Sequence, residues 1–367
     1  MRNIKNLSFI LLLILSSSCS FLGKEHLSSI NDEFYLYVNN GGNLEIINIR
    51  EKNKQINVDK NAKVNFKETG DILHSLAYIK EGKIIGTFYD KVGGNLNNKV
   101  VTIYKDKVKK DITLKNKGPS HIIADPIRNR AYILSAILPG VHKNGIPLEI
   151  INTSSDREIG SISIKGAPLN YSIYKDKLYL TVVKANELGY QDVPNNYILQ
   201  IDLPSGIQRI MTPNGFNYSP KGMSISNDGN IFVIKMPLNP KEFKNSSLIG
   251  YDLYGNQICE YPLPTGGRDI VIDEDGLAYI THNDKEIYGD RKGTTITVID
   301  TNTGEDKGKI DGLYSPTEVE MYDEFLFVIN DFSNTISVVN KAKKKIIENI
   351  SFGNNAVLSS MLIVPGV

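Results

Sequence analysis

A short strand-and-turn pattern returns seven times along this chain of 367 residues. It is clearest at 294–304, TTITVIDTNTG, where apolar and polar residues alternate, an acidic residue follows, and a Thr/Asn/Gly turn ends the run. Alternation with a period of two indicates a β-strand. The strand ends recur at intervals of 40 to 56 residues, at the pairs Ile47-Asn48, Ile103-Tyr104, Ile151-Asn152, Ile201-Asp202, Tyr251-Asp252, Ile299-Asp300 and Val339-Asn340.

A second series of landmarks, rich in Gly and Pro, runs in step with the first. Its seven members are Gly70-Asp71, Gly118-Pro119, Ala167-Pro168, Ser219-Pro220, Gly266-Gly267, Ser315-Pro316 and Gly353-Asn354. Repeats of this length are typical of arrays whose units cannot bury their apolar faces alone. The chain is therefore expected to fold as seven similar units that bury apolar surface between them.

Each unit contains the signals of four short strands. In the sixth unit these are 269–272, 277–281, 296–300 and 308–310, with the Asp-Gly turn at 273–276 suited to a hairpin. No segment after the N-terminal region shows a sustained helical period. Seven units of four antiparallel strands predict an all-β, seven-bladed β-propeller, which leaves only short, protected edges. An open β-solenoid, with shorter repeats and free ends, is the alternative.

The two ends of the chain favour a closed ring. The last landmark is followed by an apolar strand, 356–364, with no further repeat, and the first strand, 34–38, has no landmark before it. Each end thus supplies part of a unit. We expect the C-terminal strand to be the innermost one of a shared blade, with residues 34–58 supplying the other three.

Several strands resemble the YVTN-type propeller repeat, named for a Tyr-Val-Thr-Asn run on the second strand of each blade. The matching runs are Tyr37-Val38-Asn39-Asn40, Tyr279-Ile280-Thr281-His282-Asn283, Phe327-Val328-Ile329-Asn330 and the whole stretch 333–355. The resemblance covers about residues 33–364 and is clearest in blades six, seven and one. It implies a propeller from a superfamily of extracytoplasmic binding proteins, surface-layer proteins and a few enzymes, so fold alone leaves function open.

The N-terminal residues have the features of an export signal. Arg2 and Lys5 precede a nine-residue apolar run, 7–15, which is too short for a membrane-spanning helix of roughly 20 residues. The following SSSC resembles a bacterial lipobox, although Leu15 lies four residues before Cys19 rather than three. We expect a lipoprotein signal peptide at 1–18, lipid (palmitate) attachment at Cys19, a tether at 19–32 and the propeller at 33–367. An ordinary secretory signal is the alternative.

Charge and cysteine content limit the classes of partner. With 42 basic and 41 acidic residues the chain is nearly neutral, which gives no basis for binding nucleic acid. Of its two cysteines only Cys259 remains after the anchor, so no intrachain disulfide is expected. A buried core must supply the stability, and a content of 41% hydrophobic residues is sufficient for one. We expect a monomer on the extracytoplasmic face of the cell membrane.

Long insertions between second and third strands are the first functional clue. Their ranges are 89–98, 135–147, 184–196, 235–247 and 282–293. By position all five project from one face of the disc, and loops of this length without secondary structure of their own are often functional. They favour a surface that binds a protein or glycan of the cell envelope. Tolerated insertions without function are the alternative, since loop length costs little entropy.

Polar residues on the innermost strands are the second clue. The residues two positions past each landmark are Leu73, His121, Asn170, Gly222, Asp269, Glu318 and Ala356. If the register holds, four of them face one axis, and we name as candidate ligand-binding residues His121, Asn170, Asp269, Glu318, His282 and Arg268. Nitrogen and oxygen ligands of this kind suit a divalent cation. The competing interpretation is a wet channel lined with polar side chains, which a one-residue slip would turn away.

Two functions follow from these clues. The one favoured is a membrane-anchored, non-enzymatic binding scaffold without a cofactor. The alternative is a hydrolase or lyase, similar to propeller lactonases, that uses a metal in the central channel to polarise a carbonyl or activate water. No catalytic residue is assigned.

Overall fold

The computed structural model describes residues 33–52, 55–66, 71–91, 96–104, 107–136, 145–184, 195–283 and 293–366. The predicted signal peptide and tether, residues 1–32, lie outside this part of the chain, and so do most residues of three of the five predicted loops and residues 92–95 of a fourth. No helix within the described ranges has the length and apolar character needed to cross a membrane.

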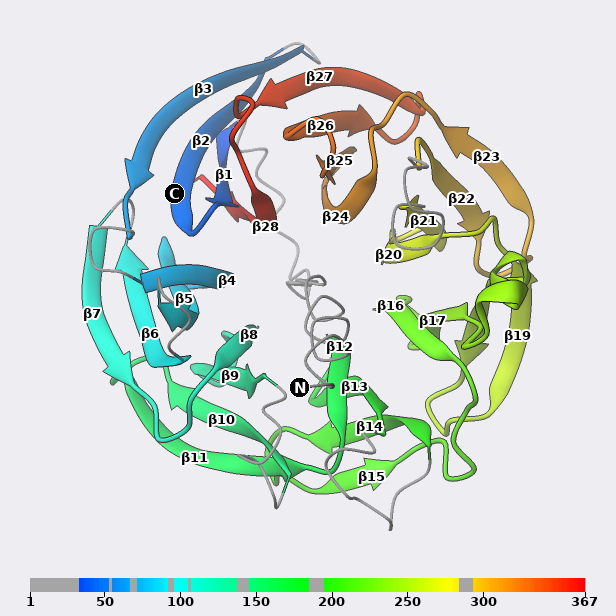
Figure 1. The fold of residues 1–367 in the computed structure, drawn as a ribbon, viewed down its shortest axis with the longest axis horizontal. Coiled ribbons are helices and arrows are strands. Elements are labelled where there is room, and N and C mark those ends of the chain that lie inside the picture. The colour runs from blue at the N-terminus through cyan, green and yellow to red at the C-terminus, as the bar shows by residue number, and fades with distance from the viewer. Residues whose placement is uncertain are drawn as a thin grey trace, which may run out of the picture.

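Seven four-stranded antiparallel sheets are arranged around a central axis, which confirms the predicted seven-bladed propeller (Figure 1). From the innermost strand outward, blade 1 contains β28 (Leu358–Pro365), β1 (Glu33–Asn40), β2 (Asn43–Lys52) and β3 (Gln55–Val64). Blade 2 contains β4 (Asp71–Lys80), β5 (Lys83–Lys91), β6 (Leu96–Tyr104) and β7 (Lys107–Thr113). Blade 3 contains β8 (Pro119–Asp125), β9 (Arg130–Ser135), β10 (Ile146–Asn152) and β11 (Arg157–Ile164).

The other four blades repeat the same order. Blade 4 contains β12 (Ala167–Tyr174), β13 (Lys177–Val183), β14 (Asn196–Asp202) and β15 (Gln208–Ile210). Blade 5 contains β16 (Ser219–Ile225), β17 (Ile231–Met236), the 3₁₀ helix η4 (Pro240–Asn245), β18 (Ser247–Tyr251) and β19 (Gln257–Pro262). Blade 6 contains β20 (Gly267–Ile272), β21 (Leu277–His282), β22 (Ile296–Asp300) and β23 (Asp306–Ile310), and blade 7 contains β24 (Pro316–Tyr322), β25 (Phe325–Asn330), β26 (Thr335–Asn340) and β27 (Lys345–Ser351).

The ring closes in blade 1 as the sequence predicts. β28 pairs antiparallel with β1, with Phe34 opposite Pro365 and Val38 opposite Met361. Beyond the paired strands, the backbone N–H of Gly366 donates a 3.0 Å hydrogen bond to the carbonyl of Glu33. Segments from opposite ends of the chain therefore form one sheet, and β28 begins two residues later than the expected start of the strand.

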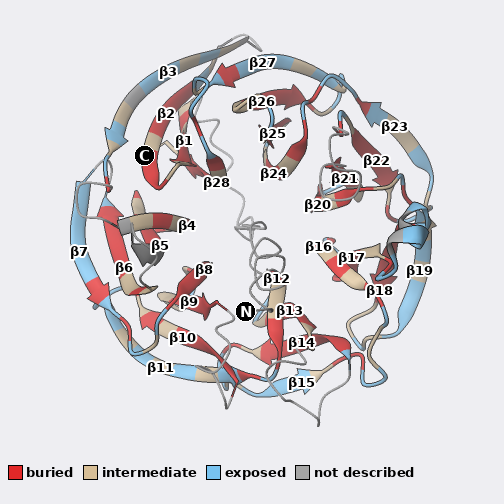
Figure 2. Cartoon of the chain, in the orientation of Figure 1, coloured by how far each residue is buried: buried red, intermediate tan, exposed pale blue. Residues whose placement is uncertain are grey.

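The core is a ring of seven apolar clusters among the described residues, one between each pair of neighbouring blades. β1 shows how the sequence builds it: Phe34 and Leu36 pack toward blade 7, whereas Tyr37 packs toward blade 2. Each sheet has a neighbouring blade on both of its faces. Successive side chains on an inner strand point to opposite faces, so apolar residues occur at both. Figure 2 shows the result, with buried inner strands and exposed outermost strands.

The register of the innermost strands differs from the predicted one in two blades. β4 contains bulges at Ile72/Leu73 and Leu73/Ser75, so the inner position is Ser75, paired with Thr87, rather than Leu73. In blade 1 the later start of β28 puts Ser360, not Ala356, at that position. In blade 2 the bulges shift the strand relative to the Gly/Pro landmark that precedes it, and in blade 1 a longer link does so.

Candidate ligand-binding pocket between blades 4 and 5

The inner-strand carboxylates bond to the next blade. Asp269 Oδ2 accepts a 3.0 Å hydrogen bond from the backbone N–H of Val319 on β24, and Glu318 Oε1 accepts one of the same length from Met361 on β28. Both residues are buried. Burial raises the pKa of Asp269 to about 6, although the hydrogen bonds that it accepts from the N–H groups of Val319 and Ile270, and the nearby Arg268, oppose this shift. The carboxylates therefore supply acceptors for the open backbone edge of a neighbouring inner strand.

The other predicted residues are also buried in contacts between elements. Asn170 Nδ2 bonds the hydroxyl of Thr181 at 2.8 Å and lies 3.5 Å from the carbonyl of Pro220 in blade 5. His121 is buried, its ring edge-on to Tyr171 of blade 4 with 6.2 Å between centroids. Burial, with the neighbouring His74, lowers the pKa of His121 to about 3, so its ring is neutral near pH 7.

His282 and Arg268 complete the predicted set. The ring nitrogens of His282 bond the carbonyl of Thr265 at 3.2 Å and the hydroxyl of Thr297 at 2.9 Å, and burial lowers its pKa to about 4. Arg268 is half-buried beside Asp269 on β20. Across the residues that the structure describes, no three His, Cys, Asp or Glu side chains form a group that could hold a metal ion.

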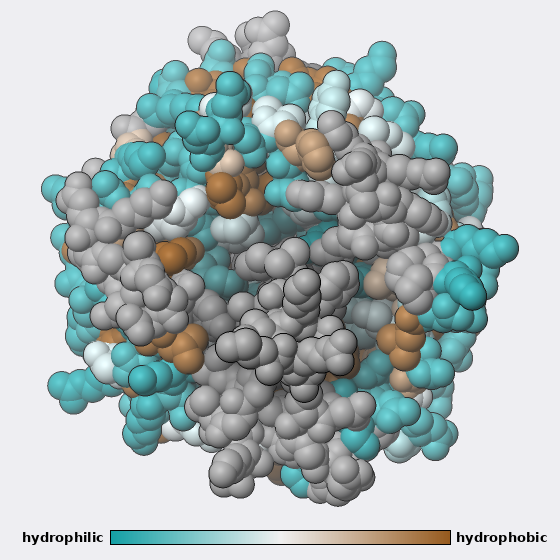
Figure 3. All heavy atoms as spheres, in the orientation of Figure 1, coloured by the Kyte–Doolittle hydropathy of each residue, from teal (hydrophilic) through white to brown (hydrophobic). Residues whose placement is uncertain are grey.

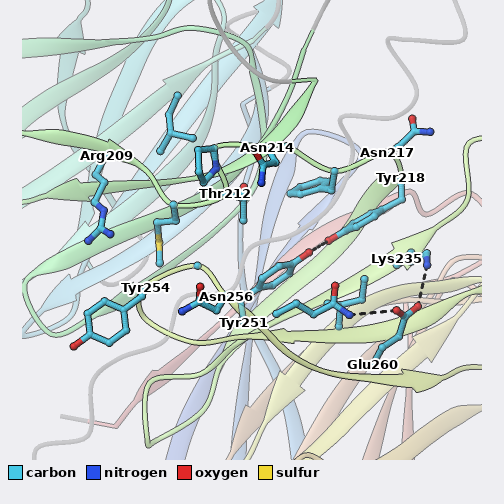
Figure 4. A pocket seen from close by; sticks show the side chains of 18 residues that line it. Arg209, Thr212, Asn214, Asn217, Tyr218, Lys235, Tyr251, Tyr254, Asn256 and Glu260 are labelled. Carbon is cyan, nitrogen blue, oxygen red and sulfur yellow. Dashed lines mark hydrogen bonds and ion pairs between the residues drawn. The ribbon is translucent and has the colours of Figure 1, made fainter.

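A pocket of about 620 Å³ lies at the rim, between blades 4 and 5 (Figure 4). The cause of the opening is the length of β15, which has three residues where the other outermost strands have five to ten. The link 211–218 continues from β15 and takes over its backbone bonding, with Met211 N–H donating to the carbonyl of Ile198 at 2.8 Å. A loop thus forms one wall of the pocket where a strand would otherwise continue.

The sequence TPNG at 212–215 turns this loop away from the sheet. Gly215 N–H donates to the carbonyl of Thr212 at 2.8 Å, with Pro213 and Asn214 at the two central positions. Pro at the second position and Gly at the fourth, here with φ of 65°, suit a type I turn. The turn places Asn214 and the residues after it along the pocket.

Aromatic rings form the floor. Phe216 stacks on Tyr218 with ring centroids 4.2 Å apart and planes 13° apart. The hydroxyls of Tyr218 and Tyr251 meet at 2.7 Å, as the dashed line in Figure 4 shows. Burial raises the pKa of both tyrosines, so the two hydroxyls stay neutral and the pair holds one wall against the other.

Polar side chains line the remaining surface. At one end Glu260 accepts hydrogen bonds from Lys235 at 2.9 Å and Ser247 at 2.7 Å, and these bonds lower the pKa of its carboxyl group. Arg209 and Tyr254 lie at the opposite end in Figure 4. Exposed amides complete the lining: Asn214, Asn217, Asn256 and Gln257.

Sequence reasoning did not single out this pocket, because it considered the loops between second and third strands and the pocket lies on a link between blades. One signal was present. The link between Ile210 and Ser219 has eight residues, the longest of the seven, and contains Pro, Gly, three Asn or Thr residues and two aromatic rings.

Loop 235–247 is the one predicted insertion described throughout. It contains η4 (Pro240–Asn245), so the expectation of a loop without secondary structure is wrong here. On the face shown in Figure 3, the visible described atoms form separate hydrophobic patches between hydrophilic ones, rather than one continuous apolar surface.

Comparisons with known proteins identify the fold alone. No protein-family model matches the chain, and no curated protein matches it. Among solved structures, the chain is similar to hydrazine synthase of Kuenenia stuttgartiensis, with 13% identity, 88% of this chain and 99% of that chain covered, and a TM-score of 0.58. It is also similar to apo AztD of Citrobacter koseri, with 12% identity, 90% and 97% coverage and a TM-score of 0.53. A nidogen/laminin complex matches at 10% identity, 90% and 98% coverage and a TM-score of 0.50.

Proposed function

We propose that this propeller is a membrane-anchored binding protein of the extracytoplasmic surface, and that its ligand enters the pocket between blades 4 and 5. The pocket carries the proposal, because it combines aromatic rings, amides and one ion pair in a cavity of about 620 Å³. Ligand sites of small molecules span roughly 300–1,000 Å³ and combine apolar walls with a few oriented polar groups.

Anchoring through Cys19 is part of the same proposal. The sequence before Cys19 supports lipidation, and the 14 residues of 19–32 would reach about 50 Å when extended. Cys19→Ser should abolish incorporation of a palmitate analogue and move the protein out of the membrane fraction. Retention of both label and membrane association would disprove this part.

The long-loop face is proposed as a second contact surface, for a protein or glycan of the envelope. The described loop 235–247 supports this, since Leu238 is 57% exposed on it. The enzymatic alternative, a metal-dependent hydrolase or lyase, has less support. Its candidate carboxylates, Asp269 and Glu318, are buried and bonded to backbone N–H groups.

Filling the pocket tests the central claim. Asn217 is exposed in the pocket lining, so Asn217→Trp adds bulk there without removing a core side chain. We expect a low-molecular-weight fraction of envelope extract to raise the melting temperature of the native protein, because a ligand that binds only the folded state stabilises it. The variant should lose this shift. Tyr314→Trp, at a residue 57% exposed on the link between blades 6 and 7, is the matched control.

A further inference from the structure

The lining of the blade 4/5 pocket combines two chemistries that few ligands use together. It presents flat aromatic surface from Phe216, which the buried Tyr218 supports from behind, and it presents side-chain amides that both donate and accept hydrogen bonds. A sugar ring has a face of C–H groups that packs on an aromatic ring, and hydroxyls around its edge that pair with amides and carboxylates. An aliphatic ligand would cover the exposed amides of Asn214 and Asn217 without pairing them, which is costly once they are desolvated.

The aromatic floor is held in place before a ligand arrives. Tyr218 and Tyr251 are each about 5% exposed, and their hydroxyl bond ties the link 211–218 to β18. Phe216 is only half-buried, with Tyr218 stacked against it. A fixed platform favours binding, because little side-chain entropy is lost when the ligand packs on it.

Charge at the Lys235 end of the pocket argues against a strongly ionic ligand there. Lys235 and Glu260 neutralise each other at 2.9 Å. A phosphate near this end would meet the Glu260 carboxylate, and a polycation would meet Lys235. Arg209, at the opposite end, is the third charged side chain of the lining, and four amides, Asn214, Asn217, Asn256 and Gln257, make up most of the remaining polar lining.

We infer that the pocket between blades 4 and 5 is a saccharide-binding site, which takes a hexose-containing oligosaccharide over the stacked Phe216–Tyr218 pair. This inference rests on the proposed function and adds the chemical class of the ligand. Phe216 provides the stacking surface, Asn217 and Gln257 bond sugar hydroxyls from opposite walls, and Glu260 accepts from a hydroxyl at the Lys235 end.

A tryptophan reporter makes binding measurable, because the chain contains no Trp. Tyr254 lines the pocket edge and is 71% exposed, so Tyr254→Trp places a single fluorophore there in the full-length protein. The probes are maltotriose, cellotriose and triacetylchitotriose, each titrated to about 10 mM, a range that detects even weak binding. At least one should change the emission with a saturable curve.

Substitutions then assign the effect to the pocket. Phe216→Ala in the reporter protein should weaken binding at least tenfold, since it removes the stacking surface. Phe332→Ala, an aromatic residue 43% exposed in blade 7, should leave binding unchanged. Melting temperatures of both variants check that each is folded. As an independent readout that needs no reporter, saturation-transfer NMR on the unmodified protein should show contacts to sugar C–H protons.

The outcomes separate the two levels of the proposal. If none of the three trisaccharides binds by fluorescence or NMR, the saccharide inference is overturned. If the envelope fraction still stabilises the protein in an Asn217-dependent way, the pocket remains a binding site for another ligand class. If binding is equal in the Phe216→Ala and Phe332→Ala variants, the sugar binds elsewhere and the assignment to this pocket is wrong.

Discussion

The inner-strand positions show how one residue pattern serves the propeller. The seven positions are Ser75, His121, Asn170, Gly222, Asp269, Glu318 and Ser360. Each innermost strand has one edge without a strand partner, so its backbone groups need other partners. Asp269 and Glu318 supply acceptors to the next blade, and Ser360 Oγ donates to the carbonyl of His74. The polarity that suggested a ligand site from sequence thus also has a structural role.

Gly222 is the one member without a side chain, and the spacing of blades 5 and 6 explains it. A Cβ at this position would lie 3.0 Å from the Arg268 carbonyl oxygen and 3.1 Å from Asp269 Cα, both backbone atoms of the next blade. Gly222→Ala should therefore destabilise the protein by about 1–3 kcal/mol, the usual cost of overpacking. Urea unfolding measures this difference.

Gly160→Ala provides the matched control for that experiment. Gly160 lies on the outermost strand β11, and a Cβ there meets no atom within 4 Å. Alanine should leave the stability unchanged or raise it slightly, since it reduces the entropy of the unfolded chain. Equal unfolding free energies for the two variants would contradict the close approach of blades 5 and 6.

Glu149 on β10 is a buried carboxylate with an incomplete set of partners. Its Oε1 accepts hydrogen bonds from the backbone and side chain of Asn116, at 3.0 and 3.1 Å, while Oε2 has no partner among the described residues. Burial raises its pKa to about 7, an effect that the Asn116 bonds oppose and Glu158 reinforces. The folded protein therefore holds a proton here more tightly than the unfolded chain does.

This shift predicts a pH-dependent stability with a defined sign. Because the folded pKa lies above the ordinary value of 4.5, the contribution of Glu149 falls as pH rises from about 4.5 to about 7. Glu149→Gln keeps the acceptor for Asn116 and cannot ionise. Relative to this variant, the native protein should lose about 2–3 kcal/mol of unfolding free energy across the window.

Urea unfolding at several pH values between 4 and 8 checks this prediction. Glu242→Gln, in exposed loop 235–247, serves as the control and should follow the native protein at every pH. A constant difference between Glu149→Gln and the native protein would show that the carboxyl group does not titrate in this range.

At the scale of elements, strand order and pairing could be predicted from sequence, whereas register and strand length could not. Short runs that are apolar or alternate apolar with polar residues mark the strands, and the short turns between them mark the hairpins. The bulges around Leu73 leave no comparable mark, since one extra residue looks like ordinary variation in loop length. The early end of β15 is similarly hidden, because residues 208–210 have the polar character of any outermost strand. The pocket depends on that early end, and so it was missed.

Loop 235–247 makes a prediction about an inserted element. The hydrogen bonds of its tip are internal: Asn239 bonds Glu242 and the N–H of Lys241. The ends are tied to the blade, with Lys235 bonded to Glu260 and the Ser246 carbonyl accepting from Leu263 N–H. Replacing residues 238–245 by a short Gly-containing turn should change the unfolding free energy by less than about 1 kcal/mol, because loop length costs little.

The same variant tests the loop as a contact surface. If the long-loop face binds an envelope partner, the shortened protein should fold normally and lose that partner, while the pocket-dependent thermal shift remains. A loss of more than about 2 kcal/mol would instead identify the loop as part of the stable core. Circular dichroism melting and urea titration distinguish these results.

At the scale of the whole molecule, the most informative feature is the seam in blade 1. The sequence indicated it because each end of the chain carries part of a repeat, and pairing those parts removes two exposed edges. β28 buries Met361, Leu362 and Val364 between blades 7, 1 and 2. The backbone N–H of Met361 on β28 also donates a hydrogen bond to the carboxylate of Glu318 from blade 7. Every blade is otherwise continuous in sequence, so closure depends on this strand.

Deleting residues 356–367 should therefore prevent stable folding. Burial of each large apolar side chain contributes about 1.5–3 kcal/mol, so the lost strand removes on the order of 10 kcal/mol, comparable with the whole stability of a typical domain. Thermal melting by circular dichroism should show no cooperative transition.

A chain that lacks only 366–367 keeps all of β28 and should melt close to the native temperature. A synthetic peptide of residues 353–367 added to the deleted chain should restore a cooperative transition, because it can pair with β1 in the register of the native strand. Native-like melting of the deleted chain without the peptide would show that the ring is stable while open, and the role of the seam in closure would be refuted.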